Sequence, residues 1–218
     1  MTMRTLYHIE VSTFSRRVRL VLAHKGLEAE LRDCRADPAN LAEMKRLSAI
    51  GMMPVLVDDG HVVPDSGAIA HYLDDAYPDT PRVFPREREA LAKALAITSA
   101  IEFAMTTLVD VGGRYFALSK DAAWSEVSSE RIGRARDAIG FVAEQATGKF
   151  LVGDQWSAAD IWAITSTLWV GGMAARAAQG TATQHVLQML TLDFHIPDAL
   201  AAWAKQHEAR PDVRAICG

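Results

Sequence analysis

A serine stands in the turn between the first predicted strand and the first predicted helix. Val11-Ser12-Thr13 follows a strand over residues 4–10 and precedes a helix that begins at about Ser15. A serine in such a turn can cap the helix and do nothing else. It can also direct its hydroxyl at a ligand thiol and stabilise the thiolate, which the positive end of the helix dipole favours too. This segment alone leaves both interpretations open.

Two further segments could bind the polar groups of a peptide-like ligand. Pro54 opens a strand, where a cis bond after Met53 would present the backbone of Met53 as an edge able to pair with an extended peptide. A trans proline at a loop–strand junction is the alternative. Asp65 and Ser66 precede an apolar helical run. They could cap that helix, or offer its N–H groups to a carboxylate and Asp65 to an ammonium group.

The elements that position these residues alternate along the first eighty residues. The predicted elements are a strand over 4–10, a helix over 15–25 ended by Gly26, a strand over 27–34, a helix opened by Asp37-Pro38, a hairpin around Asp59-Gly60 and a helix over 66–77. This order predicts a parallel strand–helix–strand unit followed by a hairpin and a covering helix. The result is a compact α/β domain.

The sequence changes character at residues 78–85, where three prolines interrupt regular structure. Beyond them the periodicity is helical. Alanine-rich runs at 90–104, 131–146, 158–178 and 198–208 predict at least four or five helices. We therefore expect an α/β domain over residues 1–78, a linker over 79–86 and an all-helical domain over 87–218.

Composition narrows the classes of function. Half of the 218 residues are hydrophobic and the formal net charge is −4, which gives no electrostatic case for binding nucleic acid or an anionic membrane. The N-terminus lacks the apolar segment of a signal peptide, and the best candidate for a membrane span, Ile161 to Ala175, is too short. Cys34 and Cys217 form no C-x-x-C pair, and the histidines show no metal-ligand spacing. We expect a soluble, cytoplasmic protein without a metal, and not a thioredoxin-type disulfide reductase.

Taken in order, these segments resemble the glutathione transferase superfamily. The matching runs are Leu6-Tyr7-His8, Arg17-Val18-Arg19-Leu20, Lys25-Gly26, Pro54-Val55-Leu56-Val57-Asp58-Asp59-Gly60, Asp65-Ser66-Gly67-Ala68-Ile69 and a helix-capping run from Phe150 to Ile161. The resemblance covers nearly the whole chain and is weakest over residues 171–195. It implies a thioredoxin-like N-terminal domain, an all-helical C-terminal domain, glutathione as co-substrate, and a cytoplasmic homodimer active in detoxification.

The resemblance also implies roles for individual residues. Counting back from Arg17-Val18-Arg19 places Ser12 where the serine-type zeta and theta classes carry the serine that stabilises the thiolate. Met53 would bind the cysteinyl backbone of glutathione, and Asp65 with Ser66 would hold its γ-glutamyl group. The glutathione-binding residues implied are Met53, Pro54, Asp65, Ser66 and Thr13.

The expected reaction is attack of the glutathione thiolate on a small electrophile, in a transferase or in an isomerase or reductive dehalogenase of the same design. The electrophile would lie against the helical domain. Candidate pocket walls are Phe103, Met105, Tyr115 and Phe116, although a core position is the alternative for each. Which electrophile reacts cannot be predicted from such unspecialised apolar side chains.

Two alternatives accompany this prediction. Met52 stands where many members of the family carry a lysine, which favours a non-catalytic module that binds a ligand or a protein partner. Tyrosine-type classes place their catalytic hydroxyl at the end of the first strand, near Tyr7 and His8. Because side chains alternate along a strand, Tyr7 and His8 point to opposite faces of the sheet and only one of them could face the site. Counting from Arg17-Val18-Arg19 favours His8 at the site, and histidine is not the catalytic residue of the family. We interpret both as packing residues.

Overall fold

The computed structural model describes residues 4–114, 122–182 and 184–218. Its N-terminal part is built on a mixed four-stranded sheet with the strand order β2-β1-β3-β4. The strands are β1 (Arg4–His8), β2 (Glu30–Asp33), β3 (Val55–Asp58) and β4 (His61–Pro64). β1 pairs in parallel with β2 and antiparallel with β3, and β3 pairs antiparallel with β4. This is the predicted parallel unit followed by a hairpin.

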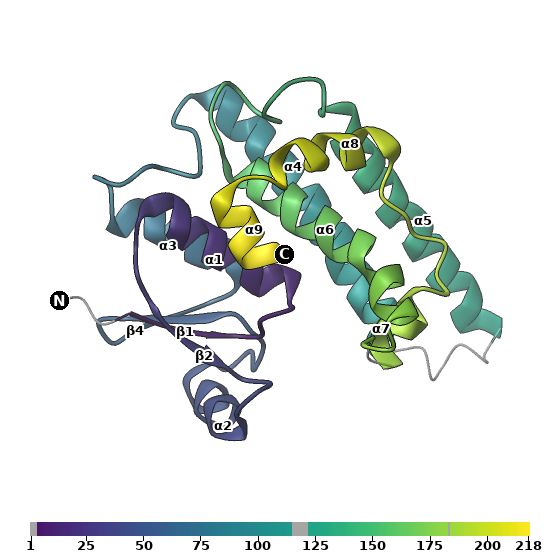
Figure 1. The fold of residues 1–218 in the computed structure, drawn as a ribbon, viewed down its shortest axis with the longest axis horizontal. Helices are drawn as coiled ribbons and strands as arrows, with labels where there is room; N and C mark the ends of the chain where they lie inside the picture. Colours follow the sequence, from purple (N-terminus) through teal and green to yellow (C-terminus); the bar gives the residue numbers. More distant parts are fainter. Residues whose placement is uncertain (1–3, 115–121, 183) are drawn as a thin grey trace.

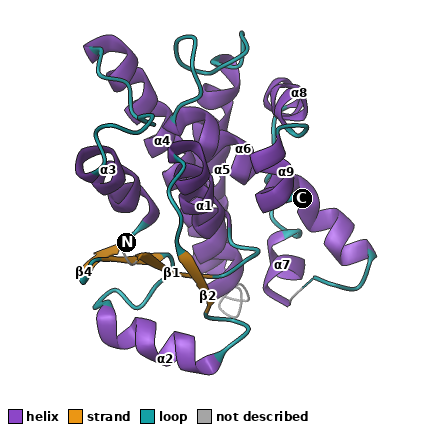
Figure 2. Ribbon diagram, turned by 60° about the vertical axis from the view of Figure 1, so that its left-hand side comes forward, coloured by secondary structure: helices purple, strands orange, loops and turns teal. Residues whose placement is uncertain are grey.

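Helices cover both faces of this sheet. They are α1 (Thr13–Lys25), α2 (Pro38–Leu47) and α3 (Ser66–Ala76). α1 and α3 lie together on one face and α2 lies alone on the other (Figure 2). Leu6 and Tyr7 are successive residues of β1 and join different buried clusters, Leu6 with the residues of α1 and α3 and Tyr7 with Met44 of α2. The period-two alternation of the strand therefore separates the two layers.

The rest of the described chain is helical. Its elements are α4 (Arg88–Val109), a π-helical turn η1 (Asp110–Arg114), α5 (Ala122–Glu144), α6 (Ala158–Ala178), α7 (Gln184–Met189), α8 (Asp198–His207) and α9 (Pro211–Cys217). α6 runs through the middle of this region, and α9 returns to lie beside α1 (Figure 1). One buried cluster extends from Leu6 in the sheet to Trp203 in α8. The two parts of the chain thus share a core.

The hairpin between β3 and β4 turns at the predicted pair. Asp59 and Gly60 both have positive φ, 47° and 85°, as a tight two-residue turn requires. The preceding Asp58 is buried and accepts three hydrogen bonds, from Arg4 Nε at 3.1 Å, Tyr72 Oη at 3.1 Å and Tyr77 Oη at 2.6 Å. Burial and then the neighbouring Asp58 carboxylate raise the pKa of Tyr72 to about 12. This cluster ties the end of β3 to β1 and α3.

The predicted capping box at the start of α6 is present. Ser157 is the N-cap, and the buried carboxylate of Asp160 accepts hydrogen bonds from Ser157 N, Ser157 Oγ and Leu151 N, each at 2.8 Å. Burial raises the pKa of the Asp160 carboxyl group, and these hydrogen bonds oppose that rise. The box fixes the start of α6, which carries part of the site described below.

α4 is a long and largely apolar helix. Residues Arg88–Gly112 are long and apolar enough, by length and composition alone, to cross a membrane, and half of the apolar stretch is buried inside the protein. The sequence pattern pointed instead to Ile161 to Ala175, within α6, as the best candidate for a membrane span. α4 packs against α5 and α6, so its composition also suits the core helix of a soluble protein.

Candidate active site

Two hollows meet where the N-terminal domain faces the helical region. The β3–α3 hollow, of about 220 Å³, is lined by Phe14, Ile50, Met52, Met53, Pro54, Asp65, Ser66, Glu102, Thr106, Val109 and Asp110. The Ser12 hollow, of about 300 Å³, is lined by Ile9, Val11, Ser12, Thr13, Phe14, Arg35, Val109, Trp169, Arg176, Thr181, Ala182 and Val186. Phe14 and Val109 belong to both linings, so the two hollows adjoin.

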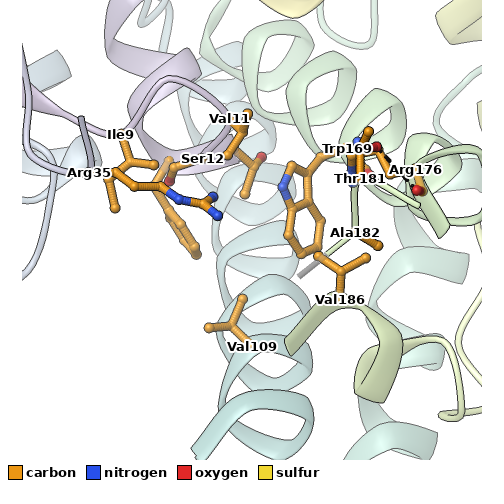
Figure 3. Close-up of a pocket in the computed structure, with 12 residues that line it drawn as sticks. Ile9, Val11, Ser12, Arg35, Val109, Trp169, Arg176, Thr181, Ala182 and Val186 are labelled. Carbon is orange, nitrogen blue, oxygen red and sulfur yellow. Dashed lines mark hydrogen bonds between the residues drawn. The ribbon is translucent and has the colours of Figure 1, made fainter. Parts of the chain in front are cut away.

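Ser12 reaches its hollow from the turn after β1. Its backbone N–H donates to Ile9 O at 3.0 Å, and its Oγ lies 3.5 Å from Ser15 N as the N-cap of α1. That capping contact is long and uses an acceptor lone pair of the hydroxyl. The O–H of Ser12 can therefore still donate to a group in the hollow, between the side chains shown in Figure 3.

Thr13 lies beside Ser12 but faces the helical region. It is buried, and its Oγ1 lies 3.5 Å from Ser166 Oγ of α6. Thr13 is absent from the lining of the β3–α3 hollow, which holds the other four predicted glutathione-binding residues. The structure thus places its hydroxyl at the contact between α1 and α6.

Arg17 of α1 contacts residues of the helical region. Its guanidinium is fully buried, pairs with Glu102 of α4, and donates to Ser166 Oγ at 3.2 Å. It also lies 4.6 Å from the centre of the Phe14 ring. Burial lowers the pKa of Arg17, and the Glu102 carboxylate opposes that shift. Because Phe14 and Glu102 both line the β3–α3 hollow, this contact helps to fix its shape.

Met53, Pro54, Asp65 and Ser66 come together in the β3–α3 hollow. The Met53–Pro54 peptide bond is cis, as one of the two interpretations required. Asp65 has a φ of 75° and caps α3 by accepting from Gly67 N at 2.8 Å and Ala68 N at 3.0 Å. The capping and ligand-binding interpretations of Asp65 are therefore compatible, since its second carboxylate oxygen can contact a ligand.

Ser66 supplies a polar atom that its surroundings leave unused. The residue is 1% exposed, and its Oγ has no hydrogen-bond partner among the residues that the structure describes. An unpaired buried hydroxyl costs roughly 1–3 kcal/mol. A ligand group bound at the N-terminus of α3 would supply the missing partner and would meet the positive end of the helix dipole.

α4 contributes a different face from the one predicted. Glu102, Thr106 and Val109, spaced by four and three residues, line the β3–α3 hollow. Met105 is fully buried in the core, and Phe103 is 41% exposed with the Arg134 guanidinium 5.5 Å from its ring. Neither lines the two hollows, because each is one position from a lining residue, Glu102 or Thr106, and one position turns a side chain by about 100° around the helix. Tyr115 and Phe116, the other two candidates, lie outside the described residues.

Several lining residues were not singled out in the sequence. Trp169 and Arg176, two helical turns apart on α6, form one side of the Ser12 hollow, and Val186 of α7 lies near them. The seven-residue spacing of a large aromatic and a cation on one helix face was the available signal. Phe14, next to Thr13, also lines both hollows. A phenylalanine is common in protein cores, so its residue type does not indicate a binding site.

Tyr7 and His8 pack inside the N-terminal domain. Tyr7 is 2% exposed and its Oη accepts from Arg32 Nη1 at 3.0 Å. His8 is also buried, and burial is the main reason that its pKa is lowered. Neither side chain lines either hollow.

Comparison with known proteins agrees with this geometry. Residues 6–81 match the family model described as the N-terminal domain of glutathione S-transferase. A glutathione S-transferase of Triticum aestivum is 31% identical over 164 residues, which cover 72% of this chain and 73% of that protein. A probable maleylacetoacetate isomerase of Caenorhabditis elegans is 28% identical over 159 residues, with the same coverage of 72% and 73%.

A solved structure supports the fold. The crystal structure of a glutathione S-transferase from Methylobacterium radiotolerans, in complex with glutathione sulfonate, aligns with a TM-score of 0.74 and 21% identity over 98% of this chain and 94% of that one. The small mixed sheet and the helices behind it thus define a protein with a thioredoxin-like N-terminal domain and a helical C-terminal region. With the sequence matches, the chain belongs to the glutathione S-transferase family.

Proposed function

We propose that this protein binds glutathione in the β3–α3 hollow and uses its thiolate to attack a small electrophile held in the Ser12 hollow. The observation that carries the proposal is the position of Ser12 in a hollow that adjoins the one lined by Met53, Asp65 and Ser66. A peptide bound in the β3–α3 hollow would have to extend only past Phe14 to bring its thiol to Ser12. The two volumes together fall within the range of roughly 300–1,000 Å³ typical of ligand sites.

The γ-glutamyl end of glutathione has matching groups in the β3–α3 hollow. Its carboxylate would accept from Ser66 Oγ at the N-terminus of α3, where the dipole favours a negative charge. Its ammonium group would meet the carboxylates of Asp65, Glu102 and Asp110, which all line this hollow. The backbone of Met53, just before β3, would pair with the cysteinyl residue.

Ser12 would act on the sulfur. Its O–H would donate to the thiolate and so lower the thiol pKa below the usual value of about 8.5. The thiol proton passes to solvent, the thiolate forms a bond to the electrophilic carbon, and the leaving group departs with the bonding electrons. The apolar side chains around Ser12 exclude water from this step.

The names of the relatives support two types of reaction. One relative is named a glutathione S-transferase and another a probable maleylacetoacetate isomerase, so both transfer and glutathione-dependent isomerisation fit the same hollows. A role in detoxification and a cytoplasmic location accord with a transferase of this family. The non-catalytic alternative does not require glutathione binding, and the experiment below tests it on that point.

A homodimer is the proposed assembly. Apolar side chains of both parts of the chain are exposed, among them Val62 on β4 and Leu95 and Phe103 on α4. A contact between the N-terminal domain of one subunit and the helical region of the other would bury such side chains. Sedimentation of the purified protein as a monomer would contradict it.

Calorimetric titration of glutathione into the wild type and the Asp65→Asn variant tests the binding site. Asparagine keeps a side-chain oxygen to cap α3 and tolerates the positive φ of residue 65, so only the charge is removed. Losing a charged hydrogen bond worth about 1.5–3 kcal/mol weakens glutathione binding by about 10- to 100-fold. Asp198→Asn, a matched change at an exposed position of α8, is expected to bind like the wild type.

Three outcomes separate the hypotheses. Binding that weakens in Asp65→Asn alone supports the site. Equal affinity in all three proteins would remove Asp65 from it. If the wild type does not bind millimolar glutathione or is not retained on glutathione-agarose, the transferase proposal fails and the non-catalytic module takes its place.

A further inference from the structure

The Ser12 hollow combines apolar walls with two arginines. Among the described residues that line it, Arg35 and Arg176 are the only charged ones, and no carboxylate faces it. Figure 3 shows Arg35 and Trp169 on opposite sides of the space beside Ser12, with Val109 and Val186 near its lower edge. This distribution contrasts with the β3–α3 hollow, whose charged lining residues are Asp65, Glu102 and Asp110.

Arg176 is held in place along α6. Its Nη2 donates to Trp169 O at 2.8 Å, and its guanidinium lies 5.9 Å from the centre of the Trp169 ring. A Cβ at Gly172 would come within 2.6 Å of Arg176 Nη1, so the guanidinium lies over a position without a side chain. The backbone bond occupies Nη2 and leaves other N–H donors of the planar group for a ligand.

A carboxylate acts on only part of the positive charge of this region: burial lowers the pKa of Arg16, and the exposed Glu10 opposes that shift. No ion pair between described residues involves Arg16, Arg35 or Arg176. Arg16 and Arg176 are close enough to repel each other, and burial together with that repulsion lowers the pKa of Arg176. The two acids nearest to Arg35 in sequence already accept from backbone N–H groups. Asp33 accepts from those of Glu10, Arg35 and Ala36, and Asp37 accepts from that of Ala39. A bound anion would balance this charge.

We infer that the electrophile taken by the Ser12 hollow is a carboxylate, with its acid group on the Arg176 guanidinium and its apolar body against Trp169 and Val186. This inference rests on the proposed function and names its substrate class. A planar guanidinium matches a carboxylate with paired hydrogen bonds, and Arg35 adds a second positive charge from the opposite side. The carboxylate would orient the electrophilic carbon toward the thiolate beside Ser12.

A matched pair of substrates tests the inference: 4-chloro-3-nitrobenzoate and its methyl ester. In both, the glutathione thiolate forms a C–S bond at the ring carbon that carries chlorine, and chloride leaves with the bonding electrons. The ester is intrinsically more reactive, so each kcat/KM is divided by the rate constant of the uncatalysed reaction. We expect a preference for the acid of about tenfold or more, the size of one charged hydrogen bond.

Variants of the arginines test whether the preference for the acid over the ester arises in the Ser12 hollow. Arg176→Gln is expected to lower the acid-to-ester ratio by about tenfold. Arg35→Gln is expected to lower it less, because an exposed charge interacts weakly. Arg46→Gln removes the same charge from an exposed position of α2 that lines neither hollow, and it is expected to keep the wild-type ratio. Thermal unfolding verifies that each variant folds.

Binding provides a readout that does not need turnover. The S-aryl glutathione conjugates of the acid and of the ester are titrated into the wild type and the three variants. Tighter binding of the acid conjugate, reduced in Arg176→Gln, supports the inference. Equal binding of both conjugates, or a preference unchanged in both Arg176→Gln and Arg35→Gln, overturns it even if glutathione itself binds. Loss of glutathione binding in the wild type would instead refute the proposed function.

Discussion

At the scale of single residues, Ser12 combines a structural and a chemical position. Its oxygen caps α1 through a long contact with Ser15 N at 3.5 Å, so little stability depends on that bond. Ser15 does more to hold the turn, because its buried Oγ accepts from Ile9 N at 3.1 Å. The serine that could act on a thiol is therefore the one that the fold needs less.

Replacing Ser12 by alanine should separate chemistry from binding. We expect kcat to fall by about 10- to 100-fold, the value of a hydrogen bond to a charged group, with glutathione affinity nearly unchanged. The hydroxyl favours the charged thiolate, so its loss raises the thiol pKa, and the rise of kcat with pH shifts to higher pH. Steady-state kinetics across pH measure both effects. Wild-type kcat in a folded Ser12→Ala protein would remove this serine from the mechanism.

The sequence located residues most reliably where turn chemistry defines a position. Asp65 and Ser66 had to stand at a helix start, and Met53 and Pro54 at a strand start, so their meeting in one hollow follows from the order of the elements. The walls contributed by α4 and α6 could not be predicted in this way. Their composition does not say which side of a mostly apolar helix faces a cavity, and Phe103 and Met105 line neither hollow.

At the scale of elements, Asp58 joins three of them. It accepts from Arg4 of β1 and from Tyr72 of α3 and Tyr77 just after it, while itself ending β3. Asp58 and Arg4 are both buried, so each needs the other. The cluster lies at the opposite end of β3 from Met53 and helps to hold that strand in register.

The stability of the protein at alkaline pH should depend on this cluster. Tyr72 has a pKa of about 12 in the folded protein against about 10 unfolded, so folding favours its neutral form. That stabilisation is complete below about pH 10 and is lost as the pH rises toward 12. The free energy of unfolding should therefore fall across this window, and fall less in Tyr72→Phe. Urea unfolding at several pH values measures the slopes.

The control for this prediction is the free energy of unfolding of the wild type and of Tyr72→Phe near pH 8. At that pH the two proteins differ only by the hydrogen bond from Tyr72 to Asp58. Tyr7 and Tyr77 also have raised pKa values, so the Tyr72→Phe protein still loses some stability in alkali. Parallel slopes above pH 10 in both proteins would show that Tyr72 titrates normally.

Element order was predictable, whereas element ends were less so. The expected strand over 27–34 is reduced to Glu30–Asp33, and α1 begins at Thr13 rather than at about Ser15. The capping pairs at Asp37, Asp65 and Ser157 were reliable because each satisfies backbone N–H groups locally. The ends of strands depend on partners distant in sequence, which no local pattern specifies.

At the scale of the whole molecule, one ion pair among the described residues crosses between its two parts. Arg17 of α1 has no exposed side-chain surface, whereas its partner Glu102 of α4 is 39% exposed. Ser166 Oγ provides a further acceptor for Arg17 at 3.2 Å, and the rings of Phe14 and Trp162 flank the guanidinium. Removing the carboxylate would leave a buried cation paired only with neutral groups.

We expect Glu102→Ala to destabilise the protein by about 3 kcal/mol, since breaking one partner of a buried pair is costly. Adding Arg17→Met should restore part of the loss, because the uncompensated charge then disappears. Urea unfolding followed by tryptophan fluorescence measures both, and Glu130→Ala on the exposed side of α5 is the matched control. A double variant less stable than Glu102→Ala would show that Arg17 stabilises by packing rather than through its charge.

The two hollows draw most of their walls from different stretches of chain. The β3–α3 hollow is lined from residues 50–66, α4 and Asp110, and it shares only Phe14 and Val109 with the Ser12 hollow. The far side of the Ser12 hollow is lined by Trp169, Arg176, Thr181, Ala182 and Val186. In evolutionary terms, a gene of this kind can vary the second set of residues and so change the proposed electrophile site while the proposed glutathione site stays intact. A laboratory library confined to residues 169–186 would exploit the same separation to redirect the enzyme.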